Sequence, residues 1–306
     1  MTVERCDGNA ITVAETPERV VTLDGYAAQV MARLGLTDRI VGTGYPAPFT
    51  ADTDPYRREL SKVPVLSERV PVTEIVAAQR PDLVLTGFSA FGGPPGSPKD
   101  SDLTAMGTVG LAACLPGGGG DATNGASGRP LVDLAPTYDF LRALGTVFRV
   151  PDRAERLIDE LQERERAVAA RTAPGPKPRV LVVQNNPTAG QPTKTSGTAT
   201  IAHALITLAG GQNIFTDGTA MHADISPEEI VRRDPQVIWV ITDYAFITPS
   251  GPDLVEQVRA NPLLATTSAA RQGRILSTSQ YLVSFPTPLN LDALEDLANR
   301  LPGNGS

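Results

Sequence analysis

The chain has 306 residues, of which 41% are hydrophobic and 20% are charged, a length and composition that predict about two globular domains. The net charge of -7 at pH 7 argues against nucleic acid as a partner, because phosphate binding requires a basic face. No apolar run approaches the roughly 18–20 residues that span a bilayer, and residues 1–20 contain no apolar core of an export signal.

The first part of the chain alternates short apolar runs with helical patterns. Strands of four to six apolar residues separated by helices are typical of a buried parallel sheet. The second predicted helix stops before Pro81, where a proline disfavours further helix. We expect strands at 19–24, 39–44, 82–87 and 108–115, helices at 26–35 and 73–80, and a glycine-rich loop at 116–128.

Two helical segments follow. The first covers 131–148, and the second begins at Pro151 and continues to the helix-breaking sequence APGPKPR at 173–179. At 1.5 Å per residue the second helix is about 30 Å long, and it is charged over most of its surface. We interpret it as a connector between two lobes; the alternative is one more surface helix of a single large sheet.

The remaining sequence repeats the order of elements in the first part. It predicts strands at 179–185, 213–215, 235–242 and 273–278 and helices at 200–210, 226–234, 253–264 and 290–301. The predicted fold is therefore α/β, with two Rossmann-like lobes of mostly parallel strands bridged by a single long helix. We expect the lobes at 1–135 and 173–306, the helical segment at 136–172, and a ligand cleft between the lobes where the strands end.

One motif occurs twice. TEIVAAQRPDLVLT at 73–86 and PEEIVRRDPQVIWVIT at 227–242 each place a glutamate seven residues before a proline and an apolar strand. The two pairs are Glu74 with Pro81 and Glu228 with Pro235.

Sequence motifs of common enzymes are missing. There is no phosphate-binding GxxxxGK[ST] loop, GTGYPAPF at 42–49 lacks the third glycine of a dinucleotide site, and GFSAFGG at 87–93 fails the GxSxG pattern. The two histidines, His203 and His222, are too few for a typical metal receptor, and His203 fits a packed helix position. We predict no catalytic residues, no metal site and no enzyme, keeping a two-lobed α/β enzyme as an alternative.

The two cysteines, Cys6 and Cys114, allow two interpretations. In a cytosolic protein they would be unpaired thiols, whereas in an exported protein they would suggest one disulfide.

The chain resembles the substrate-binding proteins of ABC importers for ferric siderophores, cobalamin and haem. The resemblance covers nearly the whole chain and is most specific in PERVV, GLTDRIVG and LAGGQNIF, found in that order. It implies an extracytoplasmic protein, periplasmic or at the cell surface with a lipid anchor, that acts as a monomer without a cofactor of its own. The cysteine positions resemble an actinobacterial branch of the family, in which the resemblance implies a Cys6–Cys114 disulfide.

The resemblance also implies a role for the repeated glutamates. In such importers one glutamate on each lobe forms a salt bridge with arginines of the permease dimer, and Glu74 and Glu228 match these positions. The alternative is that a glutamate in the first turn simply favours the helix dipole. Glu229 is the neighbour that could be confused with Glu228.

Residues that follow the predicted strands are the candidate ligand contacts, although each could instead be ordinary loop packing. Aromatic faces with a few polar groups suit a large amphipathic ligand. His222 stands where the family usually has a ligand-facing tryptophan, while Trp239 lies in a predicted core strand. The candidates are Tyr26, Tyr45, Phe88, Ser89, Phe91, Asn185, Asn186, Lys194, Thr195, His222, Asp243, Tyr244 and Tyr281.

No arginine clearly ends a predicted strand, and Arg57, Arg58 and Arg69 are unplaced, which disfavours a strongly anionic ferric catecholate. The expected ligand is therefore a ferric siderophore of hydroxamate type, with iron present only in the bound chelate, delivered to an ABC permease. Cobalamin, haem or a deazaflavin-cofactor precursor is the alternative ligand.

Overall fold

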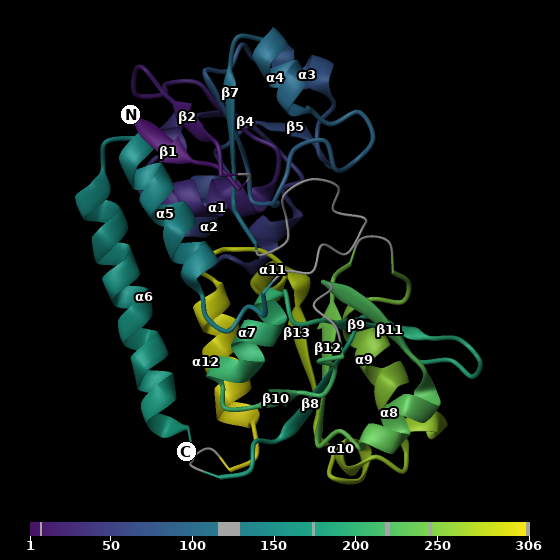
Figure 1. Cartoon of the computed structure of the whole chain (residues 1–306). Helices are drawn as coiled ribbons and strands as arrows, with labels where there is room; N and C mark the ends of the chain where they lie inside the picture. The colour runs from purple at the N-terminus through teal and green to yellow at the C-terminus, as the bar shows by residue number, and fades with distance from the viewer. Residues whose placement is uncertain (7, 116–128, 173–174, 218–220, 245–246, 304–306) are drawn as a thin grey trace. The chain divides into compact units, whose positions relative to one another are not determined.

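The computed structural model describes the chain except residues 7, 116–128, 173–174, 218–220, 245–246 and 304–306 (Figure 1). The predicted glycine-rich loop at 116–128 lies outside the described residues. Contacts divide the chain into two units. The first contains Met1–Asn124, Ala135–Gln162 and Phe285–Pro288, and the second contains Gly125–Leu134, Glu163–Ser284 and Leu289–Ser306.

The first unit is built on a five-stranded parallel sheet with strand order β5-β4-β3-β6-β7. β3 and β6 are buried along their whole length, as their apolar sequences require. One core cluster contains Val21, Val76, Val84 and Leu103. The strands are β3 (Val20–Thr22), β4 (Ile40–Gly44), β5 (Val65–Ser67), β6 (Leu83–Thr86) and β7 (Val109–Ala112). The helices are α1 (Gly25–Arg33), α2 (Tyr56–Leu60), α3 (Thr73–Ala78), α4 (Asp100–Ala105) and α5 (Ala135–Val147). Two 3-10 turns lie at Thr37–Arg39 and Ala47–Ala51.

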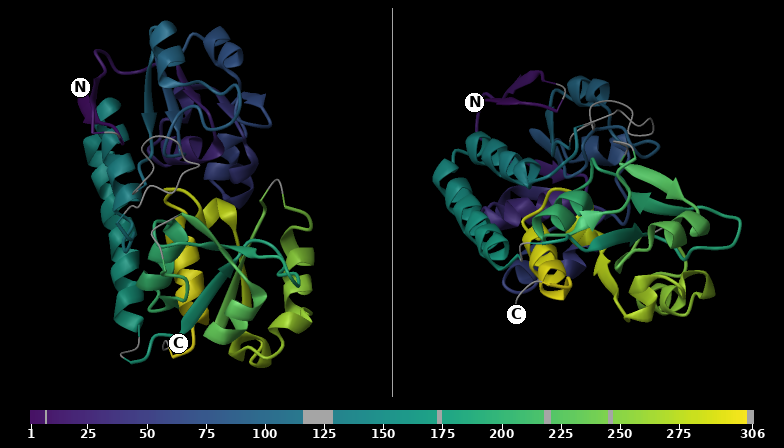
Figure 2. Two further views of the ribbon diagram at one scale, coloured as in Figure 1. Left: turned by 45° about the vertical axis from the view of Figure 1, so that its right-hand side comes forward. Right: turned by 60° about the horizontal axis from the view of Figure 1, so that its bottom comes forward.

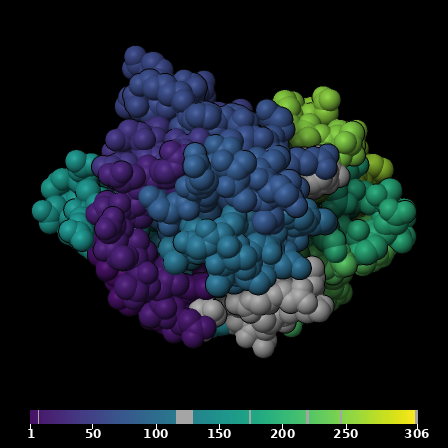
Figure 3. Space-filling model, turned by 90° about the horizontal axis from the view of Figure 1, so that it is seen from above, coloured from purple at the N-terminus to yellow at the C-terminus, as the bar shows by residue number. Residues whose placement is uncertain are grey.

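An N-terminal hairpin joins this unit through a disulfide. Strands β1 (Thr2–Glu4) and β2 (Ala10–Thr12) pair in antiparallel fashion, and β1 packs beside α5 (Figure 1). Cys6, in the hairpin turn, is bonded to Cys114 just after β7. The hairpin residues (purple) and the segments around α3 and α4 (blue) form the face of this unit seen in Figure 3.

The second unit contains a four-stranded parallel sheet with strand order β10-β8-β12-β13. All six residues of β12 are buried, and Trp239 is fully enclosed there, which confirms its predicted place in the core. The strands are β8 (Arg179–Val183), β10 (Gln212–Asn213), β12 (Val237–Thr242) and β13 (Ile275–Ser279), and the helices are α7 (Ile201–Leu208), α8 (Pro227–Arg233), α9 (Gly251–Arg259), α10 (Ser268–Arg271), α11 (Gln280–Val283) and α12 (Asn290–Arg300), with a 3-10 turn at Pro262–Leu264.

The same hydrogen-bonded junction occurs at the start of the central strands in both units. In the first, Arg19 donates to the carbonyls of Gln79 and Arg80 at the end of α3, while its backbone exchanges hydrogen bonds with Asp82. In the second, Arg179 donates to the carbonyls of Arg233 and Asp234 at the end of α8, and its backbone exchanges hydrogen bonds with Gln236. Arg19 is thus equivalent to Arg179, Arg80 to Asp234, and Asp82 to Gln236.

The longest helix, α6 (Pro151–Arg171), begins in the first unit and ends in the second. Its first half lies beside α5, where Arg142 bonds to Glu155 at 3.0 Å. Its second half lies beside α12, where Arg164 bonds to Asp292 and Glu295 (Figure 2). The ion pairs raise the pKa of Arg164, with Glu295 contributing most. No helix in the described part of the chain is long and apolar enough to cross a membrane.

The predicted α/β fold with mostly parallel sheets is confirmed, with differences in detail. The unit boundaries differ from the predicted ones, since 129–134 group with the second unit and 285–288 with the first. The helix predicted from residue 131 begins at Ala135, and the strand predicted at 213–215 is the short β10. A two-stranded antiparallel ribbon, β9 (Thr193–Ser196) with β11 (His222–Ile225), was not predicted because its sequence is polar and lacks an apolar run.

Removing the disulfide tests how much it stabilises the first unit. The bond joins residues 108 positions apart, so it restricts a long loop in the unfolded chain. We expect the double variant Cys6→Ser/Cys114→Ser to lose about 2–4 kcal/mol of unfolding free energy in urea titrations. Dithiothreitol should lower the midpoint of the wild type and leave that of the variant in place; equal midpoints for both oxidised proteins would contradict the expectation.

Candidate functional site

Four aromatic rings gather in the first unit where its strands end. The ring centroids of Phe88 and Phe285 lie 4.7 Å apart, and those of Tyr26 and Phe285 lie 5.0 Å apart, both in edge-on geometry. Tyr45 is 6.5 Å from Phe88. Tyr26 is fully buried, whereas Tyr45, Phe88 and Phe285 keep part of their surface exposed. Tyr26 therefore supports the cluster, and the other three rings present its accessible surface.

Backbone geometry at two strand ends positions these rings. Tyr45 follows β4 in a left-handed conformation with φ of 39°, and its N–H donates to the carbonyls of Ser67 and Arg69. Gly87 separates β6 from Phe88 and has no room for a side chain, since a methyl group there would lie 2.5 Å from the Cβ of Tyr26. This close approach brings the Tyr26 and Phe88 rings within 6.1 Å.

A buried carboxylate fixes the same turn. Asp24 caps α1 by accepting the N–H of Ala27, and it also accepts the Thr86 hydroxyl at 2.6 Å and the Gly87 N–H. Burial raises the pKa of Asp24, although these hydrogen bonds oppose the shift. Asp24 is therefore a structural residue that links α1 to the end of β6.

Ser89 and Phe91 lie next to the ring cluster in sequence but do not join it. The ring of Phe91 packs on the core cluster with Leu103 and covers Gly110, where a methyl group would lie 2.6 Å from the ring. The Ser89 hydroxyl is buried and has no hydrogen-bond partner among the described residues.

In the second unit, polar groups gather after β12. Asp243 has a φ of 68°, and its carbonyl accepts hydrogen bonds from Gln280 at 2.5 Å and Tyr281 at 3.4 Å. The Tyr244 hydroxyl lies 3.4 Å from that of Ser284, and burial raises the pKa of Tyr244. The structure thus brings together the predicted residues Asp243, Tyr244 and Tyr281.

The predicted residues after β8 have structural partners. The side-chain oxygen of Asn185 accepts the hydroxyl of Thr193 and the N–H of Lys194, which closes the turn into β9. That of Asn186 accepts the Asn261 amide at 2.7 Å. Lys194 pairs with Asp224 across the ribbon at 2.7 Å.

Thr195 is fully buried on the same ribbon, and its hydroxyl has no partner among the described residues. It therefore offers no accessible group to a ligand in this conformation.

His222 begins β11 opposite Ser196 and remains exposed. Gln184, the residue after β8, donates its amide to Nδ1 of His222 at 3.2 Å, which leaves the proton of the neutral ring on Nε2. Although His222 keeps exposed surface, protein atoms packed around its ring partly desolvate it and lower its pKa, and the ammonium of Lys194 lowers the pKa further. The ring is thus a neutral hydrogen-bond donor near pH 7.

His203 is packed, as its sequence position predicted. It is buried in α7, Asn213 donates to its Nδ1 at 3.2 Å, and burial lowers its pKa. The described residues contain no group of three or more potential metal ligands.

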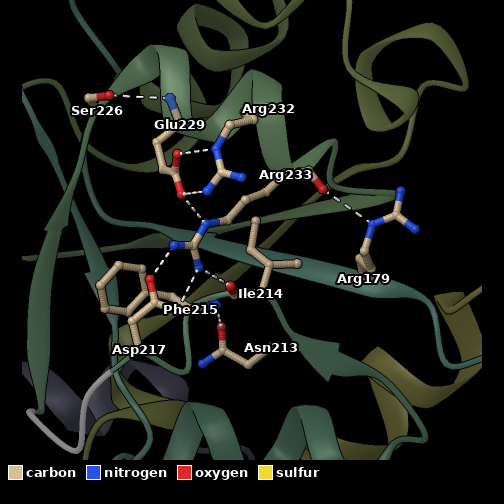
Figure 4. Close-up of polar contacts among 9 residues, drawn as sticks. All are labelled: Arg179, Asn213, Ile214, Phe215, Asp217, Ser226, Glu229, Arg232 and Arg233. Atoms are coloured by element: carbon tan, nitrogen blue, oxygen red, sulfur yellow. Dashed lines mark hydrogen bonds and ion pairs between the residues drawn. The ribbon is translucent and has the colours of Figure 1, made fainter.

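The structure separates Glu228 from its neighbour Glu229. Glu74 and Glu228 are exposed in the first turns of α3 and α8, and neither has a side-chain partner among the described residues. Glu229 instead binds Arg232 and Arg233 (Figure 4). These bonds lower the pKa of Glu229 to about 2, and the bond to Arg232 has the largest effect.

Burial settles how the two copies of the motif align. Val76 and Ile230 each lie five residues before the proline, and both are fully buried. The matching positions are therefore Glu74 and Glu228, although Ile-Val directly follows Glu229 in the second copy.

The unplaced arginines serve local structure where their contacts are known. Arg57 donates to the carbonyls of Thr50 and Asp52, and Arg58 pairs with Asp54. Arg69 is exposed.

A sequence model of the periplasmic binding proteins matches residues 20–282, which is most of the chain. The chain belongs to the periplasmic binding protein family. This confirms the predicted family. Members of the family are binding proteins and not enzymes, which favours the prediction that the chain is no enzyme, and membership implies an extracytoplasmic location.

Curated relatives of the chain carry names that refer to one ligand, vitamin B12, which is cobalamin. The vitamin B12-binding protein of Pectobacterium atrosepticum is 28% identical over 235 residues, covering 72% of this chain and 71% of the relative. The cobalamin-binding protein of Halobacterium salinarum is 25% identical over 303 residues, covering 95% of this chain and 71% of the relative.

Solved structures share the fold. That of an ABC-type Fe3+-hydroxamate transport system of Saccharomonospora viridis has a TM-score of 0.79 at 24% identity and covers 98% of both chains. That of a periplasmic heme-binding protein of Pseudomonas aeruginosa has a TM-score of 0.69 at 25% identity and covers 94% of both chains. These likenesses confirm the two-lobed binding-protein fold.

Sequence reasoning missed three residues of these clusters. Phe285 is remote in sequence from the other rings, and no strand precedes it directly. Gln184 and Gln280 hold His222 and Asp243, but each follows a strand as an unremarkable polar residue. The dipeptide Phe-Pro at 285–286 could have indicated Phe285 as a candidate ligand contact, because aromatic residues make up only 5% of this chain.

The environment of His222 predicts a pH effect. The pKa of His222 in the folded protein lies below its value in the unfolded chain, which is about 6.5. As the pH falls below about 6.5, the unfolded chain therefore binds the proton before the folded protein does, and the free energy of unfolding decreases. Lys194→Met should raise the pKa of His222 in NMR titrations and reduce this acid sensitivity. Lys177→Met, an exposed lysine elsewhere, is the control; an unchanged His222 titration in Lys194→Met would refute the contribution of Lys194.

Proposed function

We propose that this chain is the substrate-binding protein of an ABC importer, outside the cytoplasm, and that it captures a ferric siderophore of the hydroxamate type. The observation that carries the proposal is the set of accessible rings of Tyr45, Phe88 and Phe285 at the strand ends of the first unit. Aromatic faces with few polar groups favour a large amphipathic ligand.

The charges near the strand ends support a neutral chelate. Lys194 is neutralised by Asp224, and Arg57 and Arg58 are held by groups of their own loop. In the second unit the candidate contacts are the uncharged groups of Tyr244, Tyr281 and the neutral His222, together with one carboxylate, Asp243. The negative charge of a ferric catecholate would find few free cations to balance it here. A neutral hydroxamate chelate needs no such balance.

Cobalamin is the second candidate ligand, because curated relatives that share about a quarter of their residues with this chain carry that name. A corrin is also large and amphipathic, so the aromatic cluster suits it as well. In either case metal enters as part of the cargo, and we propose no resident cofactor.

We further propose that Glu74 and Glu228 bind cationic residues of the permease dimer. Both carboxylates are exposed at equivalent positions, which supports a shared role. Exposed apolar side chains lie beside them, namely Val72 and Ile75 next to Glu74 and Val231 one turn from Glu228. The protein acts in this proposal as a monomer, free or held at the surface by a lipid anchor.

Ligand titrations test the captured substrate. By isothermal titration calorimetry, ferrioxamine B should bind at least about tenfold more tightly than a ferric tris-catecholate or haemin, because these two carry negative charge that few groups near the strand ends would offset. Cyanocobalamin, which is also amphipathic and of low charge, is the competing candidate in the same titrations. Tighter binding of cyanocobalamin would replace the first candidate by the second, and no binding of any of the four would refute this class of ligand.

Shortening Phe88 tests the aromatic cluster. Phe88→Ala should weaken binding of the preferred ligand about tenfold or more, since it removes a ring contact and its buried apolar area. Val65→Ala, which shortens an exposed side chain on β5, is the control for a general effect. Equal affinities of Phe88→Ala and the wild type would place the ligand elsewhere.

Charge reversal tests docking separately from capture. Glu74→Lys/Glu228→Lys should abolish uptake in cells that carry the chain's own importer, because each lysine would face a cation of the permease. Ligand affinity measured by calorimetry should stay within about twofold of the wild type. Normal uptake by the double variant would exclude the docking role, and loss of affinity would assign these glutamates to the ligand site instead.

A further inference from the structure

The two docking helices differ in the charges around their glutamates. On α3 the residues three and four positions after Glu74 are Ala77 and Ala78, and the helix carries no cation. On α8 the residue four positions after Glu228 is Arg232. A glutamate followed four residues later by an arginine is the favourable arrangement for an ion pair on a helix surface. Glu228 therefore has a competing partner on its own helix, and Glu74 has none.

In the structure Arg232 does not pair with Glu228. Its Nε and Nη2 donate to the two carboxylate oxygens of Glu229 at 2.6 and 2.5 Å (Figure 4). Two parallel hydrogen bonds of this kind hold the guanidinium in one orientation. Arg232 is 71% exposed, so this orientation comes from Glu229 and not from packing.

Glu229 is itself fixed from the other side. Arg233 donates to Glu229, to Asp217 and to the carbonyl of Ile214, and its guanidinium lies 5.4 Å from the centre of the Phe215 ring (Figure 4). Its side chain is only 18% exposed. The N–H of Glu229 also donates to the hydroxyl of the capping residue Ser226. Glu229 thus lies between an exposed arginine, Arg232, and a largely buried one, Arg233.

We infer that Glu229 is a positioning residue of the docking surface, which holds Arg232 so that Glu228 remains available to a cation of the permease. The inference rests on the proposed docking role of Glu228. It assigns to Glu229 a part in docking without contact to the permease. It also explains why two adjacent glutamates occur at this site, whereas α3 has one glutamate and no arginine.

Binding to the importer tests this inference directly. The protein as purified would be titrated onto its permease–ATPase complex in lipid nanodiscs by surface plasmon resonance at low ionic strength, where exposed charges are least screened. Glu229→Ala should weaken binding at least about twofold, the ratio expected when an ion pair between positions four apart competes for Glu228. Glu229→Gln, which keeps the size of the side chain, should act in the same direction.

The decisive variant removes the competitor as well. Glu229→Ala/Arg232→Ala should bind like the wild type, because Glu228 then has no partner on α8. Glu256→Ala, which breaks a similar exposed pair with Arg259 on α9, controls for the loss of any surface ion pair. Wild-type binding by both Glu229 variants, or failure of the double variant to recover, would overturn the inference.

Glu228→Ala separates this result from the docking proposal. If Glu228→Ala binds normally, the docking proposal itself fails. If Glu228→Ala binds weakly while Glu229→Ala binds normally, docking stands and the inference about Glu229 is wrong. Thermal unfolding of each variant, expected to match the wild type within a few degrees, shows that the fold is retained.

Discussion

The junction between an arginine and the end of the glutamate-bearing helix sets the geometry of each unit. Arg19 directly precedes strand β3 and Arg179 is the first residue of strand β8, and each binds carbonyls at the end of α3 or α8. The adjoining backbone bonds to Asp82 and Gln236 come directly before the first strand pairs, Val20 with Leu83 and Val180 with Val237. A slip of one residue would exchange the side chains on the two faces of these strands, both of which are buried, so the junction fixes the register. Each bond contributes only about 0.5–1.5 kcal/mol, but together they join helix, strand and proline in one place.

The same junction explains what was predictable from the repeated motif. The proline ends each helix, and the residue before it, Arg80 or Asp234, takes a left-handed conformation that a continuing helix could not have. This allows a tight return into the strand and leaves the glutamate seven residues earlier on the exposed first turn. Sequence spacing placed Glu74 and Glu228 at matching positions of the two copies, and the burial of Val76 and Ile230 agrees with this alignment. It could not tell Glu228 from Glu229 by chemistry, because only the structure shows which carboxylate is bound by arginines.

The sequence predicted where along the chain the candidate ligand contacts lie, but not which way their side chains point. Parallel strands end at one edge of a sheet, which correctly located Tyr45, Phe88 and Asp243 near strand ends. Whether a side chain points outward depends on the local turn. Phe88 follows Gly87 and joins the rings, while Phe91, three residues later, packs into the core above Gly110. Phe285 escaped prediction because its neighbours in space are nearly 200 or more residues away in sequence, a separation that no local pattern records.

Charge distribution distinguishes two units that share a plan. The second unit places Arg232 and Arg233 on α8 and pairs them with Glu229 and Asp217, whereas the equivalent positions of the first unit are the uncharged residues Ala78 and Gln79. Arg233 is needed there for structure, since it binds the Ile214 carbonyl after β10 and thereby ties α8 to the segment that leads toward β11. A helix that carries such an arginine also carries a positive field near Glu228. Glu229 and Asp217 offset this field by pairing with Arg232 and Arg233. Each helix is then left with one exposed carboxylate, Glu74 or Glu228, that has no side-chain partner among the described residues, although the two helices differ in sequence.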